Sequence, residues 1–452
     1  MSLPTPAHDD SRQRLDRLSE LARDVLRLCA ARGASQAEVL LNEDAGLSVG
    51  VRLGQVETVE RNRDRGLAVT VYFGQRKGNA STADLQPGSL EATVEQACAI
   101  ARHTEPDPAA GLADADRMAT EVGEFDGWHP WALDPEAAIA LACEAEAAGR
   151  EADPRISNSE GANVSTGESL SVYANSHGFL GAERGSNHYL GLSLIAGQGD
   201  RMQRDYWYSS ALAPEDLEPA AMVGRRAAER TIARLSPRPV KTGQYPVLFV
   251  PEVARSLIGH LLAAASGGAL YRQASFLLGA LGQRILPDWF GLAERPHLMR
   301  GLRSSSFDSE GVATVDSDII RAGVLERYLL SSYSARKLGM QSTANAGGVT
   351  NLVATANASG YQELLAGMQQ GLVVTELMGQ GANTVTGDYS RGAAGFWVEN
   401  GAIAHPVDEV TIAGRLQDIF QAIEAVGADV DRRSHIGIGS VLVGRMTVAG
   451  QG

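Results

Sequence analysis

GLVVTELMGQGANTVTGDYSRGAAGFWVENG, the segment Gly371–Gly401, decides the fold expected for the C-terminal half of the chain. Its short apolar runs, Leu372–Val374 and Phe396–Val398, lie close to glycines, which adopt the positive φ of tight turns without steric cost. This pattern predicts short strands joined by tight turns, with Asp388–Arg391 in a loop between two of them. Because loops held by rigid strands carry many binding groups, this polar segment is a candidate site. A turn whose aspartate and arginine merely pair with each other is the alternative.

The composition is that of a globular protein with more than one core. The chain has 452 residues, of which 44% are hydrophobic and 21% charged, and its formal net charge is -14. This length is enough for two or three domains, and the negative charge argues against non-specific nucleic-acid binding, which requires cations that neutralise phosphates. No apolar run approaches the roughly 20 residues that span a bilayer. The polar N-terminus lacks the apolar core of a signal peptide, so we expect a cytoplasmic protein.

Residues 1–112 are expected to form a helix–antiparallel sheet–helix unit. Apolar residues follow helical spacing over Arg12–Arg32 and again over Gly88–His103. Between these helices, Leu47–Leu53 and Leu67–Phe73 alternate apolar with small or polar residues, as half-buried strands do. Gly54 and the charged run Glu60–Arg65 are assigned to the turns between strands.

A second unit with the same order of elements is expected over residues 113–236. Asp134 followed by Pro135 is typical of a helix N-terminus, since aspartate caps the first turn and proline fits its first position. This helix is predicted to reach about Ala152, and a closing helix is predicted over Pro214–Leu235. The strands predicted between them are Ser169–Asn175, Phe179–Arg184, His188–Ala196 and Gln203–Ser210.

The run Ser236-Pro237-Arg238-Pro239 marks the predicted start of a C-terminal domain, residues 237–452. Glycines and strand patterns dominate this domain, so we expect a β-rich barrel-like or sandwich-like domain, and an α+β protein as a whole. Helices are predicted in it over Glu252–Ala265, Gln362–Gly371 and Arg415–Val426.

The sequence contains no local metal motif. A zinc-peptidase helix needs two imidazoles about one turn apart, with a carboxylate beside one of them. His260 is the only histidine on the predicted helix Glu252–Ala265, and none of the side chains three or four positions from it ligates zinc. The remaining histidines are isolated in sequence, so only ligands that converge in the fold would form a site. The acidic pairs Asp308/Glu310 and Asp429/Asp431 are candidates for acid–base or cation chemistry, although such pairs at surface turns are usually solvated.

Several long strings resemble the TldD/PmbA peptidase family. They are GQRKGNASTADL near the N-terminus, and SFDSEGVAT, YLLSSYSARKLGMQSTANAGG, VTELMGQGANTVTGDYSRGAAGFWVENG and MTVAGQ in the C-terminal half. Together they extend over nearly the whole chain and are most similar to the PmbA branch, also called TldE. The resemblance implies a cytoplasmic complex in which a TldD chain pairs with a PmbA chain.

For the TldD branch, the resemblance implies zinc on a His-Glu-x-x-x-His helix, whose glutamate is the general base, and a cysteine of the C-terminal domain near the metal. This chain has no such motif on the corresponding helix and no cysteine after Cys143. We therefore expect no metal and no catalytic residue in this chain, and zinc in a TldD-type partner. The expected role is that of the non-catalytic subunit of a heterodimer. Whether the chain forms a homodimer when the partner is missing is left open.

The substrate-channel or interface residues are predicted within the polar segment quoted first. Extended peptides are held by adding strands to exposed sheet edges, and the strands around Thr384–Gly395 are expected to offer such an edge. The predicted residues are Asn383, Asp388, Tyr389, Ser390 and Arg391. A purely structural turn is the alternative for each of them.

Two other functions remain open. A stand-alone metallopeptidase with dispersed ligands would bind metal and cleave peptides by itself. A protein-binding modulator would co-purify with a partner that has no peptidase activity, and the resemblance also implies a link to modulation of DNA gyrase. With a net charge of -14, such a modulator would contact protein and not DNA.

Overall fold

Six strands in the N-terminal half form one antiparallel sheet in the computed structural model, which describes residues 10–450. They are β1 (Gln36–Arg52), β2 (Gln55–Phe73), β3 (Arg76–Thr82), β4 (Ile156–Asn175), β5 (Leu180–Ala196) and β6 (Gln203–Ala211). Their order is β3-β2-β1-β4-β5-β6, so the strands of both expected N-terminal units lie in a single sheet. The two sets of strands meet where β1 pairs with β4, from Glu38 opposite Asn175 to Val51 opposite Ala162.

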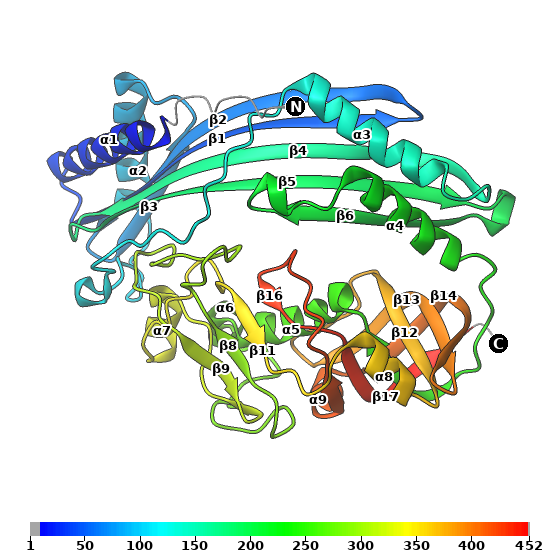
Figure 1. Ribbon diagram of the computed structural model, residues 1–452. Helices are drawn as coiled ribbons and strands as arrows, with labels where there is room; N and C mark the ends of the chain where they lie inside the picture. The colour runs from blue at the N-terminus through cyan, green and yellow to red at the C-terminus, as the bar shows by residue number, and fades with distance from the viewer. Residues whose placement is uncertain (1–9, 451–452) are drawn as a thin grey trace.

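The two faces of this sheet have different neighbours, because side chains alternate along a strand. On β1, the side chains of Val39, Leu41, Leu47 and Val49 are buried against helices. These helices are α1 (Ser11–Ala31) and α2 (Pro87–His103) at one end of the sheet, and α3 (Pro135–Arg150) and α4 (Ala220–Ala233) towards the other. The opposite face of the sheet is turned towards the C-terminal domain (Figure 1).

The strands are longer than the side-chain pattern predicts. The turn predicted at Gly54 is confirmed as the hairpin turn Leu53–Gly54, whereas the charged run Glu60–Arg65, also assigned to a turn, lies inside β2 with every side chain exposed. The two strands predicted over Phe179–Arg184 and His188–Ala196 are one strand, β5. The turn predicted at Glu60–Arg65 and the division of β5 into two strands were wrong for the same reason. Backbone pairing with a neighbouring strand continues through residues whose side chains no longer alternate between a buried and an exposed face.

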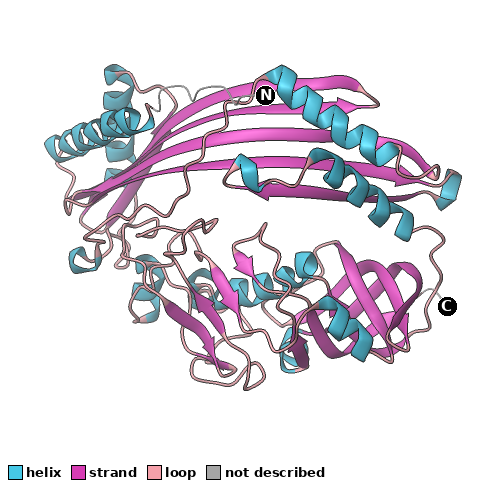
Figure 2. Cartoon of the chain, in the orientation of Figure 1, coloured by secondary structure: helices cyan, strands magenta, loops and turns pink. Residues whose placement is uncertain are grey.

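The C-terminal domain is built around a closed β-barrel (Figure 2). Its strands are β7 (Gly243–Phe249), β12 (Gln370–Met378), β13 (Asp388–Glu399), β14 (Ala402–Arg415) and β17 (Val441–Ala449). They pair in the order β14-β13-β12-β7-β17, and the barrel closes because β14 also pairs with β17. This arrangement confirms the predicted α+β fold with a barrel-like C-terminal domain.

A smaller sheet, one long helix and four short helices complete the described part of this domain. The long helix is α5 (Pro251–Ala265), which directly follows β7 and packs its apolar face into the domain core. The strands of the smaller sheet, in pairing order, are β10 (Val324–Leu325), β9 (Ser317–Arg321), β8 (Leu292–Glu294), β11 (Leu352–Ala354) and β16 (Ile436–Gly437). The short helices are α6 (Gly267–Tyr271), α7 (Ser332–Leu338), α8 (Tyr361–Gly367) and α9 (Leu416–Gln421). Within residues 10–450, no helix has the length and apolar character needed to cross a lipid bilayer.

Some local predictions for this domain were wrong. The helix predicted over Arg415–Val426 ends at Gln421, and the next residues form strand β15 (Ile423–Val426), which pairs with β17. The helix predicted to reach Gly371 ends at Gly367. The predicted loop Asp388–Arg391 is the start of β13, which pairs there with β14. In each segment a partner strand that is distant in sequence decides the conformation, and local patterns do not show that partner.

A buried glutamate ties the β1–β2 hairpin to helix α3. Glu146 is 1% exposed, and its carboxylate accepts hydrogen bonds from the backbone N–H groups of Leu53 (2.8 Å) and Gly54 (2.7 Å) at the hairpin turn. At the turn these two N–H groups have no acceptor on a neighbouring strand. The carboxylate of Glu146 accepts their hydrogen bonds instead. The α3 helix is thereby fixed over the far end of the sheet.

Replacing Glu146 by alanine should lower the free energy of unfolding by about 1–3 kcal/mol, because two backbone donors lose their acceptor. Urea denaturation followed by circular dichroism measures the change. Glu144→Ala, at an exposed position of the same helix, is the matched control and should change stability by less than about 0.5 kcal/mol. Equal effects of the two substitutions would show that the hairpin does not depend on this carboxylate.

Candidate functional site

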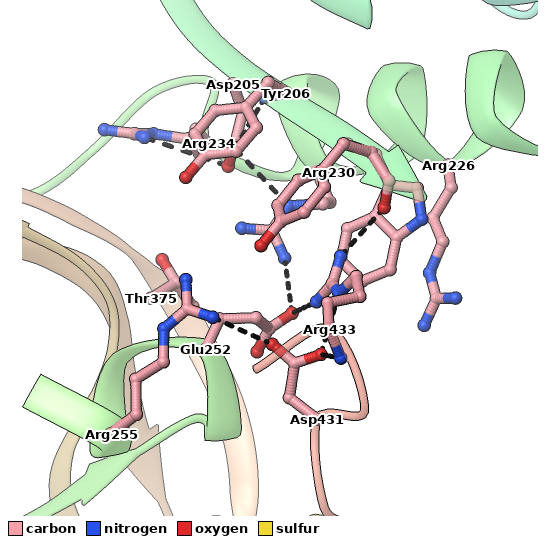
Figure 3. Close-up of polar contacts among 12 residues, drawn as sticks. Asp205, Tyr206, Arg226, Arg230, Arg234, Glu252, Arg255, Thr375, Asp431 and Arg433 are labelled. Carbon is pink, nitrogen blue, oxygen red and sulfur yellow. Dashed lines mark hydrogen bonds and ion pairs between the residues drawn. The ribbon is translucent and has the colours of Figure 1, made fainter. Parts of the chain in front are cut away.

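A cavity of about 280 Å³ lies where the C-terminal domain meets the last strand of the N-terminal sheet. One wall comes from β6 and α4 and includes Trp207, Tyr208 and Arg230. The other wall comes from α5, β12 and β13, with Glu252 at the start of α5. Figure 3 shows side chains of the two walls pointing toward one another. The cavity therefore exists only when the two halves of the protein are docked.

Arg433 connects the two walls. The central carbon of its guanidinium lies 4.1 Å from the ring centroid of Trp207 and 4.4 Å from that of Tyr208, and one nitrogen donates to the Tyr208 carbonyl oxygen (2.9 Å). The same guanidinium pairs with Asp431 (2.7 Å) and Glu252 (3.2 Å) in its own domain (Figure 3). A planar guanidinium can stack on aromatic rings and donate hydrogen bonds at once, so this side chain holds both halves together.

The carboxylates around the cavity are paired with arginines. Asp205 on β6 is 6% exposed and accepts a hydrogen bond from Arg230 (3.3 Å). Two further pairs cross between the halves: Arg230 with Glu252 (3.7 Å), and Arg234 with Glu376 of β12. Because an unpaired buried charge is strongly destabilising, these pairs make the docked arrangement of the two walls specific.

Four buried polar atoms, two on residues that line this cavity and two on neighbouring residues of the same elements, have no hydrogen-bond partner among the described residues. They are Ser256 Oγ, His260 Nε2, Tyr389 Oη and Arg391 Nε. Ser256 and His260 lie about one turn apart on α5, and the rings of His260 and Tyr389 are in edge contact with their centroids 5.9 Å apart. Ser256 and Arg391 line the cavity itself. Buried polar atoms without partners are rare in native proteins, which makes this cluster the strongest candidate site.

The cluster does not fit zinc. A catalytic zinc needs three protein ligands among imidazole, thiolate and carboxylate groups, whereas this cluster offers one imidazole and two hydroxyls. Burial, and then the positive charge of Arg391, lower the pKa of His260, and that same charge repels a cation. Within residues 10–450, no group of three or more His, Cys, Asp or Glu side chains is arranged to hold a metal ion.

A larger cavity of about 620 Å³ lies between the helix-free face of the sheet and loops of the C-terminal domain. Three acidic side chains on its wall, Glu38, Glu183 and Asp308, are largely buried, and burial raises the pKa of each. Glu38 accepts a hydrogen bond from the hydroxyl of Tyr173 (2.9 Å). The Asp308 carboxylate accepts hydrogen bonds from three backbone N–H groups, so this member of the predicted acidic pairs holds a loop.

The structure separates the five predicted site residues into two groups. Arg391 lines the cavity, and Tyr389, two residues before it on β13, belongs to the cluster of unpartnered polar atoms beside the cavity. Asn383, Asp388 and Ser390 lie at the β12–β13 hairpin, where the side chains of Asn383 (2.9 Å) and Asp388 (2.6 Å) accept hydrogen bonds from Val385 and Thr386 of the same turn. Over residues 10–450, no ion pair links Asp388 to Arg391. The segment is therefore not a turn in which the aspartate and the arginine pair with each other.

The free sheet edge expected around Thr384–Gly395 is also not formed as predicted. From residue 392 onward, β13 pairs with β12 on one side and with β14 on the other, because the barrel is closed. Sequence reasoning further missed the contribution of Trp207 and Arg433, whose segments are joined by a hydrogen bond across 225 residues. No local pattern connects positions so far apart. Within one element, the four-residue spacing of Ser256 and His260 on a predicted helix does indicate that the two side chains share a helix face.

Comparison with known proteins gives matches along most of the sequence. The models of the PmbA/TldA metallopeptidase domain 1, central domain and C-terminal domain match residues 37–101, 128–235 and 242–450. Metalloprotease PmbA of Escherichia coli O157:H7 is 48% identical, and the match covers 96% of both proteins. A crystal structure from Bacteroides thetaiotaomicron, of a proposed modulator of DNA gyrase, has a TM-score of 0.92 at 28% identity and covers 96% of this protein and 99% of its own length. TldE from Thermococcus kodakarensis has the same fold, with a TM-score of 0.84 at 19% identity over 95% of this protein and 100% of its own length.

Replacing Arg433 by lysine should lower the free energy of unfolding by about 1–3 kcal/mol, because an ammonium group cannot stack on two rings while bonding two carboxylates. Urea denaturation followed by circular dichroism measures the change. Arg432→Lys, at the exposed neighbouring residue, is the control and should unfold as the wild type does. Wild-type stability of the Arg433 variant would show that this side chain does not hold the halves together.

The stability of the protein should fall between about pH 4 and pH 6 in part through Asp308. Burial raises the pKa of this carboxyl from 3.8 to about 6, so over this interval the folded state keeps a proton that the unfolded state has released. The stabilisation from protonated Asp308 is full below pH 4 and is lost as the pH rises through 6. Urea denaturation at several pH values should give a flatter profile for Asp308→Asn. The exposed Asp316→Asn control should keep the wild-type slope, and a wild-type slope in both variants would contradict the assignment.

Proposed function

This protein belongs to the PmbA/TldD metallopeptidase family, in its PmbA branch, and from that premise we propose that it is the non-catalytic subunit of a cytoplasmic peptidase complex. Its partner is a TldD-type subunit that holds the zinc ion. Its role is to line the path of extended or unfolded peptides towards the partner's active site. The proposal gives the two cavities between sheet and barrel a common purpose, since both open along the seam between the two halves of the protein.

Helix α5 carries this proposal. The segment Arg255–His260 has the spacing of the His-Glu-x-x-x-His motif of the TldD branch, with Arg255 and Ser256 in the places of the first histidine and the glutamate. Arg255 is a cation that pairs with Asp431 (3.6 Å), so it repels a metal, and the Ser256 hydroxyl cannot take a proton from water as a carboxylate does. Only His260 remains of the three groups, and its neighbours do not complete a zinc site.

The first test is elemental analysis of zinc in tag-free protein purified without a TldD-type subunit. We expect less than one zinc per ten protein molecules, and no cleavage of an unfolded peptide mixture by this protein alone. Mixing it with a TldD-type subunit should give a complex on size-exclusion chromatography and peptidase activity that a chelator abolishes. Stoichiometric zinc and chelator-sensitive cleavage by the isolated protein would overturn the proposal. A stable complex that never shows peptidase activity would favour a protein-binding modulator instead.

A further inference from the structure

The four unpartnered groups at the smaller cavity, of which Ser256 and Arg391 line it, can all donate a hydrogen bond. The Arg391 guanidinium only donates, the hydroxyls of Ser256 and Tyr389 can donate, and a neutral imidazole donates from whichever nitrogen carries its proton. Their buried atoms have no partner among the described residues, and Tyr389 is 1% exposed. A ligand that satisfies such a set must offer several acceptor lone pairs at one point. A carboxylate, with two oxygens, does so.

The charges around the cavity favour the same ligand. Glu252, Glu376 and Asp205 line the cavity, but each is paired with Arg230, Arg234 or Arg433. Arg255, another arginine of the wall, pairs with Asp431. Arg391 is the cation of this wall for which the described residues show no carboxylate partner and no hydrogen-bond acceptor. The guanidinium of Arg391 is therefore left to neutralise an incoming anion, in a geometry suited to two parallel hydrogen bonds.

We propose that this cavity binds a carboxylate of a peptide through Arg391 and Ser256, which line it. The carboxylate is that of a peptide C-terminus or of an acidic side chain. The neighbouring wall suits the rest of such a peptide, because Tyr206 and Tyr208 present stacked rings with centroids 6.2 Å apart in the lining of the same cavity. The identification of the ligand as a peptide rests on the proposed function, whereas the preference for a carboxylate rests on the cavity alone.

The carboxylate preference can be measured on the complete protein without any partner. Isothermal titration calorimetry compares three probes: N-acetyl-tetra-alanine with a free C-terminus, its C-terminal amide, and an amide in which glutamate replaces the third alanine. The free acid, the glutamate peptide or both should bind at least about tenfold more tightly than the alanine amide, because a charge-assisted pair is lost in the amide. Which of the two binds tells whether the site reads a C-terminus or an acidic side chain.

Arg391→Gln should remove this discrimination, so that acid and amide bind within about twofold of each other, and Arg391→Lys should restore part of it. Ser256→Ala is a milder variant, which should weaken the acid several-fold while leaving the amide unchanged. Arg445→Gln, at an exposed arginine on β17, is the matched control and should bind all probes as the wild type does. Circular dichroism verifies that each variant is folded.

Equal affinity of the wild type for the three probes would overturn the proposal, and so would discrimination that survives in the Arg391→Gln variant. Absence of binding of every probe at millimolar concentration would also overturn it. These outcomes are separate from those that test the subunit role. A complex with a TldD-type subunit that cleaves peptides, together with an isolated protein that does not prefer carboxylates, would remove the carboxylate site and leave the proposed function standing.

Discussion

Both cavities depend on the docking of the barrel domain against the sheet, and Arg433 joins the two walls of the smaller cavity. Arg433 lies between the rings of Trp207 and Tyr208 on the sheet side and the carboxylates of Asp431 and Glu252 on the barrel side. Stacking, hydrogen bonding and charge pairing therefore act at the same point. An apolar contact could bring the two halves together, but only directional bonds of this kind fix one half relative to the other closely enough to form a cavity of defined shape.

The sheet can serve two neighbours because its strands are long and their side chains alternate. One set of residues on each strand packs under helices α1 to α4, and the other set is left for polar contacts with the C-terminal domain. The alternation of side chains along each strand thus places the residues that stabilise the N-terminal half on one face of the sheet and the residues that line the larger cavity on the other face. The helix-covered face holds the apolar cores of the N-terminal half. The opposite face carries groups such as Glu38 and Tyr173, whose hydrogen bond lies in the wall of the larger cavity.

Helix α5 presents polar side chains of the smaller cavity to the seam between the domains. Val253, Leu257, Ile258 and Leu261 keep the helix in the core, so its polar face points at the seam between the domains. On that face lie Arg255, Ser256 and His260. The unsatisfied donors there and the positive charge of Arg391 suit an anion and not a cation.

The sequence by itself determined the α+β class, the barrel-like C-terminal domain, the family and most helix positions, because these depend on local periodicity, caps and strings of residues. It also pointed to Tyr389 and Arg391 within a polar segment. It could not place Glu60–Arg65 inside a strand, or Ile423–Val426 in β15, since backbone pairing with another strand is not recorded in the alternation of side chains. Only the tertiary structure brought Trp207 to Arg433 and Tyr389 to His260. Contacts between domains arise from docking, and docking leaves no period or spacing in the sequence.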